Sequence, residues 1–147
     1  MPGMMRYIKD SDMMFIVNLE RDTAHDPLTK KQIREYRQKK NVTIVVCEDK
    51  QPVGYAIFKI FPKYLEIVRL AVDPLLRRKG FGTRIIDSII QCKSNKEREK
   101  IVIEVHQDYL TSHLFLKAMD FTAIQKKDNP EIYEFTYLIP QEELVEA

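Results

Sequence analysis

The sequence predicts an α/β fold in which helices pack on a mixed β-sheet, with residues 1–147 forming a single domain. Two patterns support this class. Some segments carry apolar residues at helical spacing, and others are runs of β-branched and aromatic residues typical of strands. With 44% hydrophobic residues, a chain of 147 residues can bury a core without disulfides or metals.

The first half of the chain is expected to hold two helices and then strands. A short strand at Arg6–Ile8 precedes an apolar helical pattern at about 11–22. His25-Asp26-Pro27 interrupts the pattern, and Thr29 with Gln32 has the spacing of a capping box, so a second, more exposed helix follows.

Three strands are predicted next, and the third is apolar on both faces. Val42–Cys47 and Val53–Ile60 flank a polar turn at 48–52 and predict an antiparallel hairpin. Leu65–Val72 has almost no polar face, which is typical of a central strand.

The second half alternates helices and strands. An isoleucine stripe predicts a helix after Gly82, Ile101–Val105 is a strand, and a helix at 110–119 leads to strands at Phe121–Gln125 and Ile132–Leu138. Five apolar residues of the 110–119 helix are expected to face the core: Leu110, Leu114, Phe115, Ala118 and Met119. Leu116 points about 150° away from the centre of that stripe and is expected to lie outside the core.

Composition argues against several classes of protein. The net charge of +2 gives little support to nucleic-acid binding. The apolar runs are far shorter than the ~20 residues of a membrane helix, and the first residues lack a signal-peptide pattern, so we expect a cytoplasmic protein without a membrane partner. Cys47 and Cys92 have no paired spacing, so neither a disulfide nor a metal site is predicted.

The strongest chemical signal is the segment Arg77-Arg78-Lys79-Gly80-Phe81-Gly82-Thr83, between the central strand and a helix. A helix N-terminus with glycines and basic side chains can hold a pyrophosphate. An ordinary glycine turn with solvated basic residues explains the pattern equally well. The third glycine of a dinucleotide fingerprint and the Gly-Lys-Ser/Thr of a P-loop are both missing, so NAD and ATP are poorly supported.

The segment Arg77-x-x-Gly80-x-Gly82 resembles the acetyl-CoA loop of the GNAT (Gcn5-related N-acetyltransferase) superfamily. Ile67–Pro74 is similar to the strand before that loop, and Ile103-Glu104-Val105 is similar to the strand after it, so the resemblance covers about 64–121. Within the superfamily, the chain is most similar to the ribosomal-protein alanine N-acetyltransferase branch.

The resemblance implies a mostly antiparallel sheet of six to seven strands, split in a V and flanked by about four helices. It also implies acetyl-CoA as cosubstrate, with the pantetheine arm beside the strand at 65–72. The residues implied to bind this cosubstrate are Leu70, Ala71, Val72, Arg77, Arg78, Lys79, Gly80, Phe81, Gly82, Thr83 and Leu116.

The implied reaction is direct attack of a primary amine on the thioester in a ternary complex, and a protein N-terminal α-amine is the expected acceptor. The family's acceptor site implies contributions from the first two helices, the loop His25–Leu28 and the hairpin near 126–132. The basic residues between Lys30 and Lys39 suit an acidic acceptor or a solvated helix equally. A non-catalytic acetyl-CoA sensor and an enzyme for small-molecule amines stay open, as do a monomer and a homodimer.

Two glutamates are candidates for the base. Glu104 lies in an otherwise apolar strand, where burial would raise its pKa toward neutrality, and the resemblance implies that it is the base of the N-terminal branch. Glu66 matches the base position of the histone-acetylating branch. Each could instead lie at a solvated strand end and be inert.

The chain departs from the family in the 110–119 helix. Many members place there a tyrosine that protonates the CoA thiolate, and this sequence has Leu116 instead. Contact with the pantetheine arm would explain an aliphatic residue at that position. Tyr109 aligns with a position where the family often has an asparagine that contacts the cofactor, and its hydroxyl is a candidate either for that contact or for the role of the missing acid.

Overall fold

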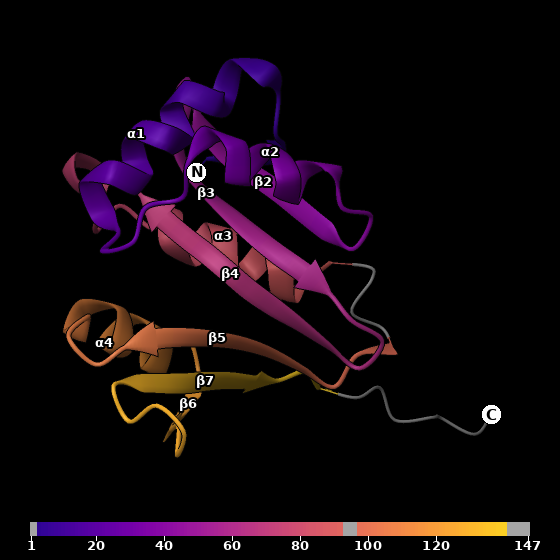
Figure 1. The fold of residues 1–147 in the computed structure, drawn as a ribbon, viewed down its shortest axis with the longest axis vertical. Coiled ribbons are helices and arrows are strands. Elements are labelled where there is room, and N and C mark those ends of the chain that lie inside the picture. Colours follow the sequence, from indigo (N-terminus) through magenta and orange to yellow (C-terminus); the bar gives the residue numbers. More distant parts are fainter. Residues whose placement is uncertain (1–2, 93–96, 141–147) are drawn as a thin grey trace. The chain divides into compact units, whose positions relative to one another are not determined.

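The computed structural model describes residues 3–92 and 97–140, and its elements follow the predicted order (Figure 1). The strands are β1 Met4–Tyr7, β2 Val42–Asp49, β3 Gln51–Ile60, β4 Tyr64–Val72, β5 Lys100–His106, β6 Thr122–Gln125 and β7 Ile132–Leu138. The α-helices are α1 Met13–Thr23, α2 Lys30–Gln38, α3 Phe81–Ile90 and α4 Leu110–Ala118, with short 3₁₀ helices at Asp10–Asp12 and Pro74–Leu76. The predicted α/β class with one mixed sheet is therefore confirmed.

The chain forms two compact units that share β4. The first unit comprises residues 1–60 and 67–89, and the second comprises 61–66 and 90–147, within the described ranges. Strands hydrogen-bond in the order β1-β2-β3-β4 in the first unit and β4-β5-β7-β6 in the second. Across residues 3–92 and 97–140, no helix is long and apolar enough to cross a membrane.

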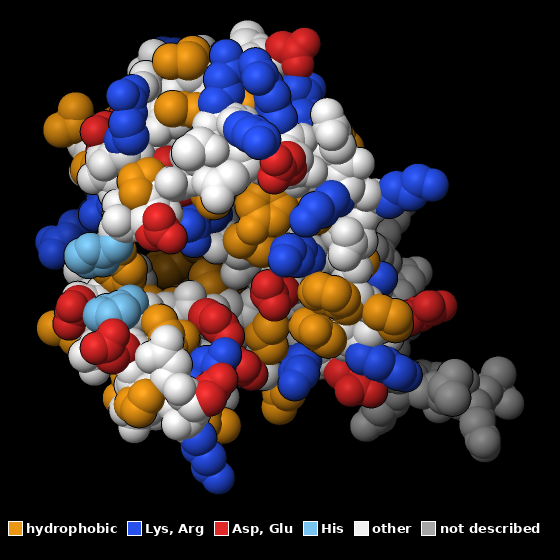
Figure 2. Space-filling view, in the orientation of Figure 1, with side chains coloured by type: hydrophobic (Ala, Val, Ile, Leu, Met, Phe, Trp, Pro, Cys, Tyr) orange, Lys and Arg blue, Asp and Glu red, His pale blue; other side chains and the backbone are white. Residues whose placement is uncertain are grey.

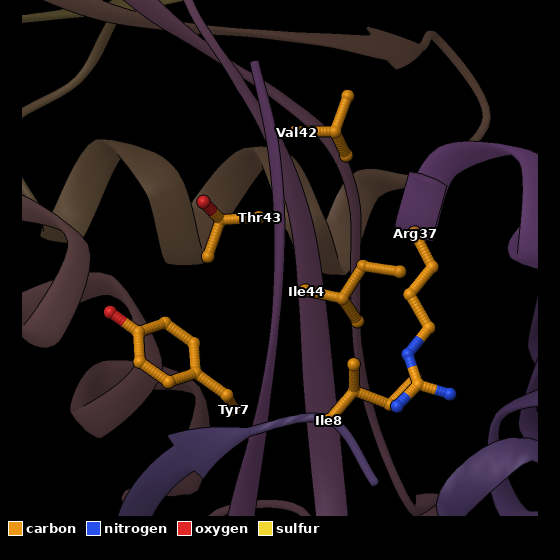
Figure 3. Close-up of a pocket in the computed structure, with 6 residues that line it drawn as sticks. All are labelled: Tyr7, Ile8, Arg37, Val42, Thr43 and Ile44. Atoms are coloured by element: carbon orange, nitrogen blue, oxygen red, sulfur yellow. The ribbon is translucent and has the colours of Figure 1, made fainter. Parts of the chain in front are cut away.

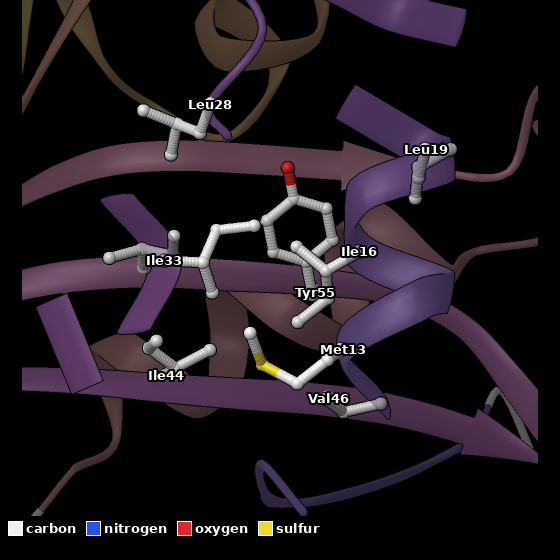
Figure 4. Close-up of a cluster of buried hydrophobic side chains, with 9 residues drawn as sticks. Met13, Ile16, Leu19, Leu28, Ile33, Ile44, Val46 and Tyr55 are labelled. Carbon is white, nitrogen blue, oxygen red and sulfur yellow. The ribbon is translucent and has the colours of Figure 1, made fainter. Parts of the chain in front are cut away.

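The core of the first unit lies between helices α1 and α2 and the strands β2 and β3 (Figure 4). Its nine buried side chains are Met13, Ile16, Leu19, Leu28, Ile33, Ile44, Val46, Tyr55 and Ile57. Figure 4 shows the Tyr55 ring among them, with its hydroxyl directed away from Met13 and Val46. The helical spacing of the α1 residues and the alternation of the strand residues place these side chains on the facing surfaces.

Local signals in the first half are confirmed. Thr29 caps α2 by accepting the N–H of Gln32 at 3.2 Å, and the Gln32 side chain returns to the N–H of Thr29 at 2.8 Å. β2 and β3 form the predicted antiparallel hairpin. The turn is tighter than expected, because Lys50 adopts a left-handed φ of 66° and residues on both sides of it pair as strands.

A partly buried ion pair holds the 3₁₀ turn Asp10–Asp12 that leads into α1. The two terminal nitrogens of Arg6 bond the two carboxylate oxygens of Asp12 at 2.8 and 2.9 Å, and the N–H of Lys9 donates to Asp12 at 2.7 Å. Asp12 is 2% exposed. The hydrogen bond from Arg6 lowers the pKa of the Asp12 carboxyl and outweighs the opposing effect of burial.

Helix α4 covers the second unit with a face that differs from the predicted one. Leu116 is 1% exposed, whereas Leu110 and Leu114 are 68% and 71% exposed. The His113 ring packs edge to face on Tyr133 and Phe135 of β7, with centroids 5.3 and 4.9 Å apart. His113 and Leu116 lie one helical turn apart, so they set the buried face, and the expectation that Leu116 lies outside the core is wrong.

Candidate active site

The Arg77–Thr83 loop joins β4 to α3 within the first unit. The Asp73 carboxylate accepts the N–H of Leu75 at 3.0 Å and starts the 3₁₀ turn. Arg78 and Gly80 then adopt left-handed φ values of 66° and 86°. Gly80 accommodates this conformation because it lacks a Cβ, and its carbonyl accepts the N–H of Arg84 at 3.0 Å, the first helical hydrogen bond of α3.

This geometry makes the start of α3 suited to an anion. The N–H groups of residues 81–83 have no acceptor within the helix, because a helix leaves its first N–H groups unpaired. The side chains of Arg77, Arg78 and Lys79 are exposed at the same loop. The Phe81 side chain is 5% exposed, so Phe81 belongs to the core and offers an anion only its N–H.

The β4 segment before the loop is half-buried and irregular. Val68 and Ala71 both pack against the core of the first unit. Residues three apart in a regular strand point to opposite faces, so the alternation of side chains changes between these two residues. Leu70, Ala71 and Val72 stay partly accessible. A Cβ on Gly54 of β3 would come within 2.8 Å of the Ala71 carbonyl oxygen, so Gly54 permits the close approach of β3 to this segment.

Glu104 lies on β5 in the second unit, and its expected burial is wrong. Its side chain is 51% exposed and pairs with the ammonium of Lys126, which begins the β6–β7 turn. The hydrogen bond to Glu104 raises the pKa of Lys126. Strand alternation explains the exposure: Ile101, Ile103 and Val105 point to the opposite, buried face.

Glu66 lies near the start of β4 in the second unit. It lines a pocket of about 300 Å³ with Tyr64, Lys100, Val102 and Glu134. Glu134 of β7 also stands directly opposite Glu104 in the β5–β7 register. The second unit therefore brings both candidate bases next to Glu134.

Tyr109 precedes α4 in the N-cap position, and its ring lies edge to face against His106 with centroids 6.2 Å apart. The N–H of His113 donates to the Tyr109 carbonyl at 3.0 Å. Tyr109 is thus placed at the end of β5 beside α4. Leu116 is buried about two helical turns after Tyr109.

The predicted site residues divide between the units. Leu70–Val72 and Arg77–Thr83 belong to the first unit, and Glu66, Glu104, Tyr109 and Leu116 belong to the second.

Sequence reasoning missed a buried polar cluster in the first unit. Glu20 of α1 is 1% exposed, accepts a hydrogen bond from the Tyr55 hydroxyl, and pairs with Arg69 of β4. The signal was present in the sequence. Glu20 follows Met13 and Ile16 at helical spacing, so it falls on the apolar face of α1.

The basic residues of α2 lie on its solvent face. Figure 2 shows Lys and Arg side chains gathered over the region where Figure 1 draws α1 and α2. Lys30, Lys31 and Arg34 are exposed, and Arg37 pairs with Asp10. Arg37 also lines a small pocket with Tyr7, Ile8, Val42, Thr43 and Ile44 (Figure 3). None of these six residues is among the predicted catalytic or cosubstrate-binding residues; Arg37 belongs to the basic set that would suit an acidic acceptor.

Comparison with known proteins gives a family and a fold. The sequence profile described as "Acetyltransferase (GNAT) family" matches residues 10–121. Among curated proteins, none matches the sequence significantly.

Solved structures match nearly the whole chain. Ard1 from Thermoplasma volcanium is 16% identical with a TM-score of 0.81, and the match covers 96% of this chain and 100% of that one. The ribosomal-protein-S18-alanine N-acetyltransferase from Escherichia coli is 14% identical with a TM-score of 0.80, covering 99% of each chain. Arabidopsis thaliana NAA60 in complex with acetyl-CoA is 14% identical with a TM-score of 0.79, covering 92% of this chain and 98% of that one. This chain therefore shares their fold.

Proposed function

Because this chain belongs to the acetyltransferase (GNAT) family, we propose that it transfers an acetyl group from acetyl-CoA to a primary amine, foremost the α-amine of a protein N-terminus. The amine attacks the thioester directly in a ternary complex, and residues 1–147 act as one N-acetyltransferase domain. The observation that carries the proposal is the Arg77–Thr83 loop, which combines a left-handed turn, unpaired helix N–H groups and exposed basic side chains.

The first unit supplies the proposed cosubstrate contacts. When bound, acetyl-CoA supplies an activated acyl group on a thiolate leaving group. The N–H groups of residues 81–83 and the side chains of Arg77, Arg78 and Lys79 hold the pyrophosphate, while Leu70–Val72 flank the pantetheine arm. We leave Leu116 out of these contacts, because its side chain is buried in the second unit.

The second unit supplies the proposed proton transfers. An α-ammonium has a pKa of about 8 and must lose a proton before the amine can attack the thioester. An ionised carboxylate can accept this proton directly or through water. We assign this role to Glu104, whose side chain is exposed beside Lys126, and keep Glu66 as the rival. Tyr109 is proposed to protonate the thiolate, since Leu116 has no proton to give.

The name of one structural neighbour supports the choice of a protein α-amine. The Escherichia coli structure is that of an enzyme named for the alanine of ribosomal protein S18. An α-amine also needs less help from a base than a lysine with a pKa near ~10.4. These points favour an N-terminal acceptor over a lysine side chain.

The first test is the melting temperature of the protein with acetyl-CoA, CoA or NADH. A ligand at 100 times its dissociation constant adds about 2.7 kcal/mol to the free energy of unfolding. For a chain of this size that corresponds to a rise of several degrees. We expect the rise with acetyl-CoA and CoA but not with NADH. No rise at millimolar acetyl-CoA would overturn the cosubstrate assignment.

The second test is acetyl transfer to peptides whose α-amine is free or chemically blocked, each with an internal lysine. Mass spectrometry of the fragments locates the added acetyl group. We expect modification of the free α-amine only. Tight acetyl-CoA binding without modification of any peptide or small amine would instead identify a sensor, and acetylation of small amines alone would identify a small-molecule enzyme.

A further inference from the structure

The buried carboxylate of Glu20 collects hydrogen bonds from three separate parts of the first unit. The Tyr55 hydroxyl of β3 donates to one oxygen. The N–H of Leu28 and the Nε of Arg69 donate to the other at 2.8 and 3.1 Å. A buried charge is tolerated only when paired and hydrogen-bonded, and these donors meet that requirement.

Arg69 extends the same cluster to the connection between α1 and α2. While its Nε bonds Glu20, its Nη2 donates to the main-chain carbonyl of Asp26 at 2.9 Å. The loop is therefore held at two main-chain points, the Asp26 carbonyl by Arg69 and the Leu28 N–H by Glu20. Leu28 is 8% exposed and anchored in the core, whereas His25 and Asp26 are exposed.

The cluster links this loop to the strand assigned to the cosubstrate. Arg69 directly precedes the Leu70–Val72 segment of β4, so one side chain ties the Asp26 main chain to the strand beside the proposed pantetheine arm. Burial and the neighbouring Glu20 raise the pKa of Tyr55, so its hydroxyl keeps its proton and stays a donor. A loop presenting exposed groups at a fixed position relative to that strand is suited to contact an acceptor.

We propose that Glu20, Tyr55 and Arg69 are positioning residues that hold the α1–α2 loop in the conformation that binds the acceptor amine. This inference rests on the proposed acetyl transfer. The three residues act through the loop main chain. Their loss is expected to weaken acceptor binding while leaving acetyl-CoA binding intact, because the Arg77–Thr83 loop makes none of the hydrogen bonds of this cluster.

The test compares Arg69→Gln and Tyr55→Phe with the matched control Arg21→Gln. Arg21 neighbours Glu20 on α1, but it is exposed and bonds Asn18. We expect the acceptor KM to rise roughly tenfold in Arg69→Gln, equivalent to about 1.4 kcal/mol, and less in Tyr55→Phe. Both variants should keep the wild-type values of three quantities: kcat, the KM for acetyl-CoA, and the rise in melting temperature with acetyl-CoA. Arg69→Lys, which keeps a charge but cannot bridge both acceptors, should recover only part of the loss.

Hydrogen exchange at the Leu28 amide supplies a readout that does not need activity. Exchange should become faster in Arg69→Gln and stay unchanged in Arg21→Gln. If Leu28 exchange rises while the acceptor KM stays constant, the cluster is only structural and the proposal fails. If the wild-type protein acetylates no acceptor while Leu28 exchange responds as expected, the proposed function fails and the loop-fixing role of the cluster stands. Tyr55→Phe keeps the test decisive if Arg69→Gln does not fold.

Discussion

Replacing Leu116 by alanine should destabilise the protein far more than the same change at Leu114, two residues earlier on α4. Leu116 is 1% exposed and Leu114 is 71% exposed. Truncating a buried leucine costs about 2–5 kcal/mol, because transfer free energy is lost and a cavity remains. A surface substitution usually stays within about 0.5 kcal/mol. The two variants delete the same atoms from the same helix, so their difference reports the buried face.

Urea denaturation followed by circular dichroism measures this difference as a change in midpoint at constant slope. At about 2–4 °C per kcal/mol, Leu116→Ala should also lower the melting temperature by at least about 4 °C, and Leu114→Ala by no more than about 2 °C. Equal losses, or a larger loss at Leu114, would refute the placement of α4 and restore the helix face expected from sequence spacing.

Three further predictions concern the strands and the ion pairs. Gly54→Ala should lower the free energy of unfolding by about 1–3 kcal/mol in urea, because the new Cβ would lie 2.8 Å from the Ala71 carbonyl oxygen, and an unchanged midpoint would contradict the crowding. Glu104→Gln should slow acetyl transfer about 10²-fold or more, with the melting-temperature rise with acetyl-CoA unchanged, whereas an equal loss in Glu66→Gln alone would shift the base to Glu66. The lowered pKa of Asp12 means that its pairing with Arg6 stabilises the fold fully above the ordinary value of 3.8, and this stabilisation is lost progressively as the pH falls from 3.8 through the lower pKa of the folded state. Urea midpoints between pH 2 and 6 should show this decline, and Asp12→Asn should flatten it.

Local signals predicted the elements well because each rests on a few neighbouring residues. The Thr29 and Gln32 capping box and the alternating runs of the hairpin depend on contacts within a few positions. The Arg77–Thr83 loop was recognisable for the same reason, since glycines and basic residues next to a helix start are visible in the sequence.

The buried face of α4 could not be predicted from the sequence, because it depends on long-range packing. The buried face of α4 is set by contacts of His113 with Tyr133 and Phe135, which lie about 20 residues later in the chain. The prediction from helical periodicity used hydrophobicity alone. It therefore assigned the more apolar side of α4, which includes Leu110 and Leu114, to the core, although these two residues are exposed.

The environment of Glu104 likewise depends on a distant residue. An apolar run suggested burial on both faces, but Lys126 of the β6–β7 turn pairs with the carboxylate at the surface. Neither the ammonium partner nor the exposed face could be read from the run itself.

The sharing of β4 between the two compact units has a consequence for synthesis on the ribosome. Tyr64–Glu66 belong to the second unit but are translated before α3, while the other strands of that unit begin at Lys100. More than 30 further residues must be translated after Glu66 before the second unit can begin to assemble. At 5–20 residues per second, this translation takes about 2–7 s. A chain cut after α3 would therefore yield a C-terminal piece that lacks one of its strands, and that piece should refold only when the N-terminal piece is supplied.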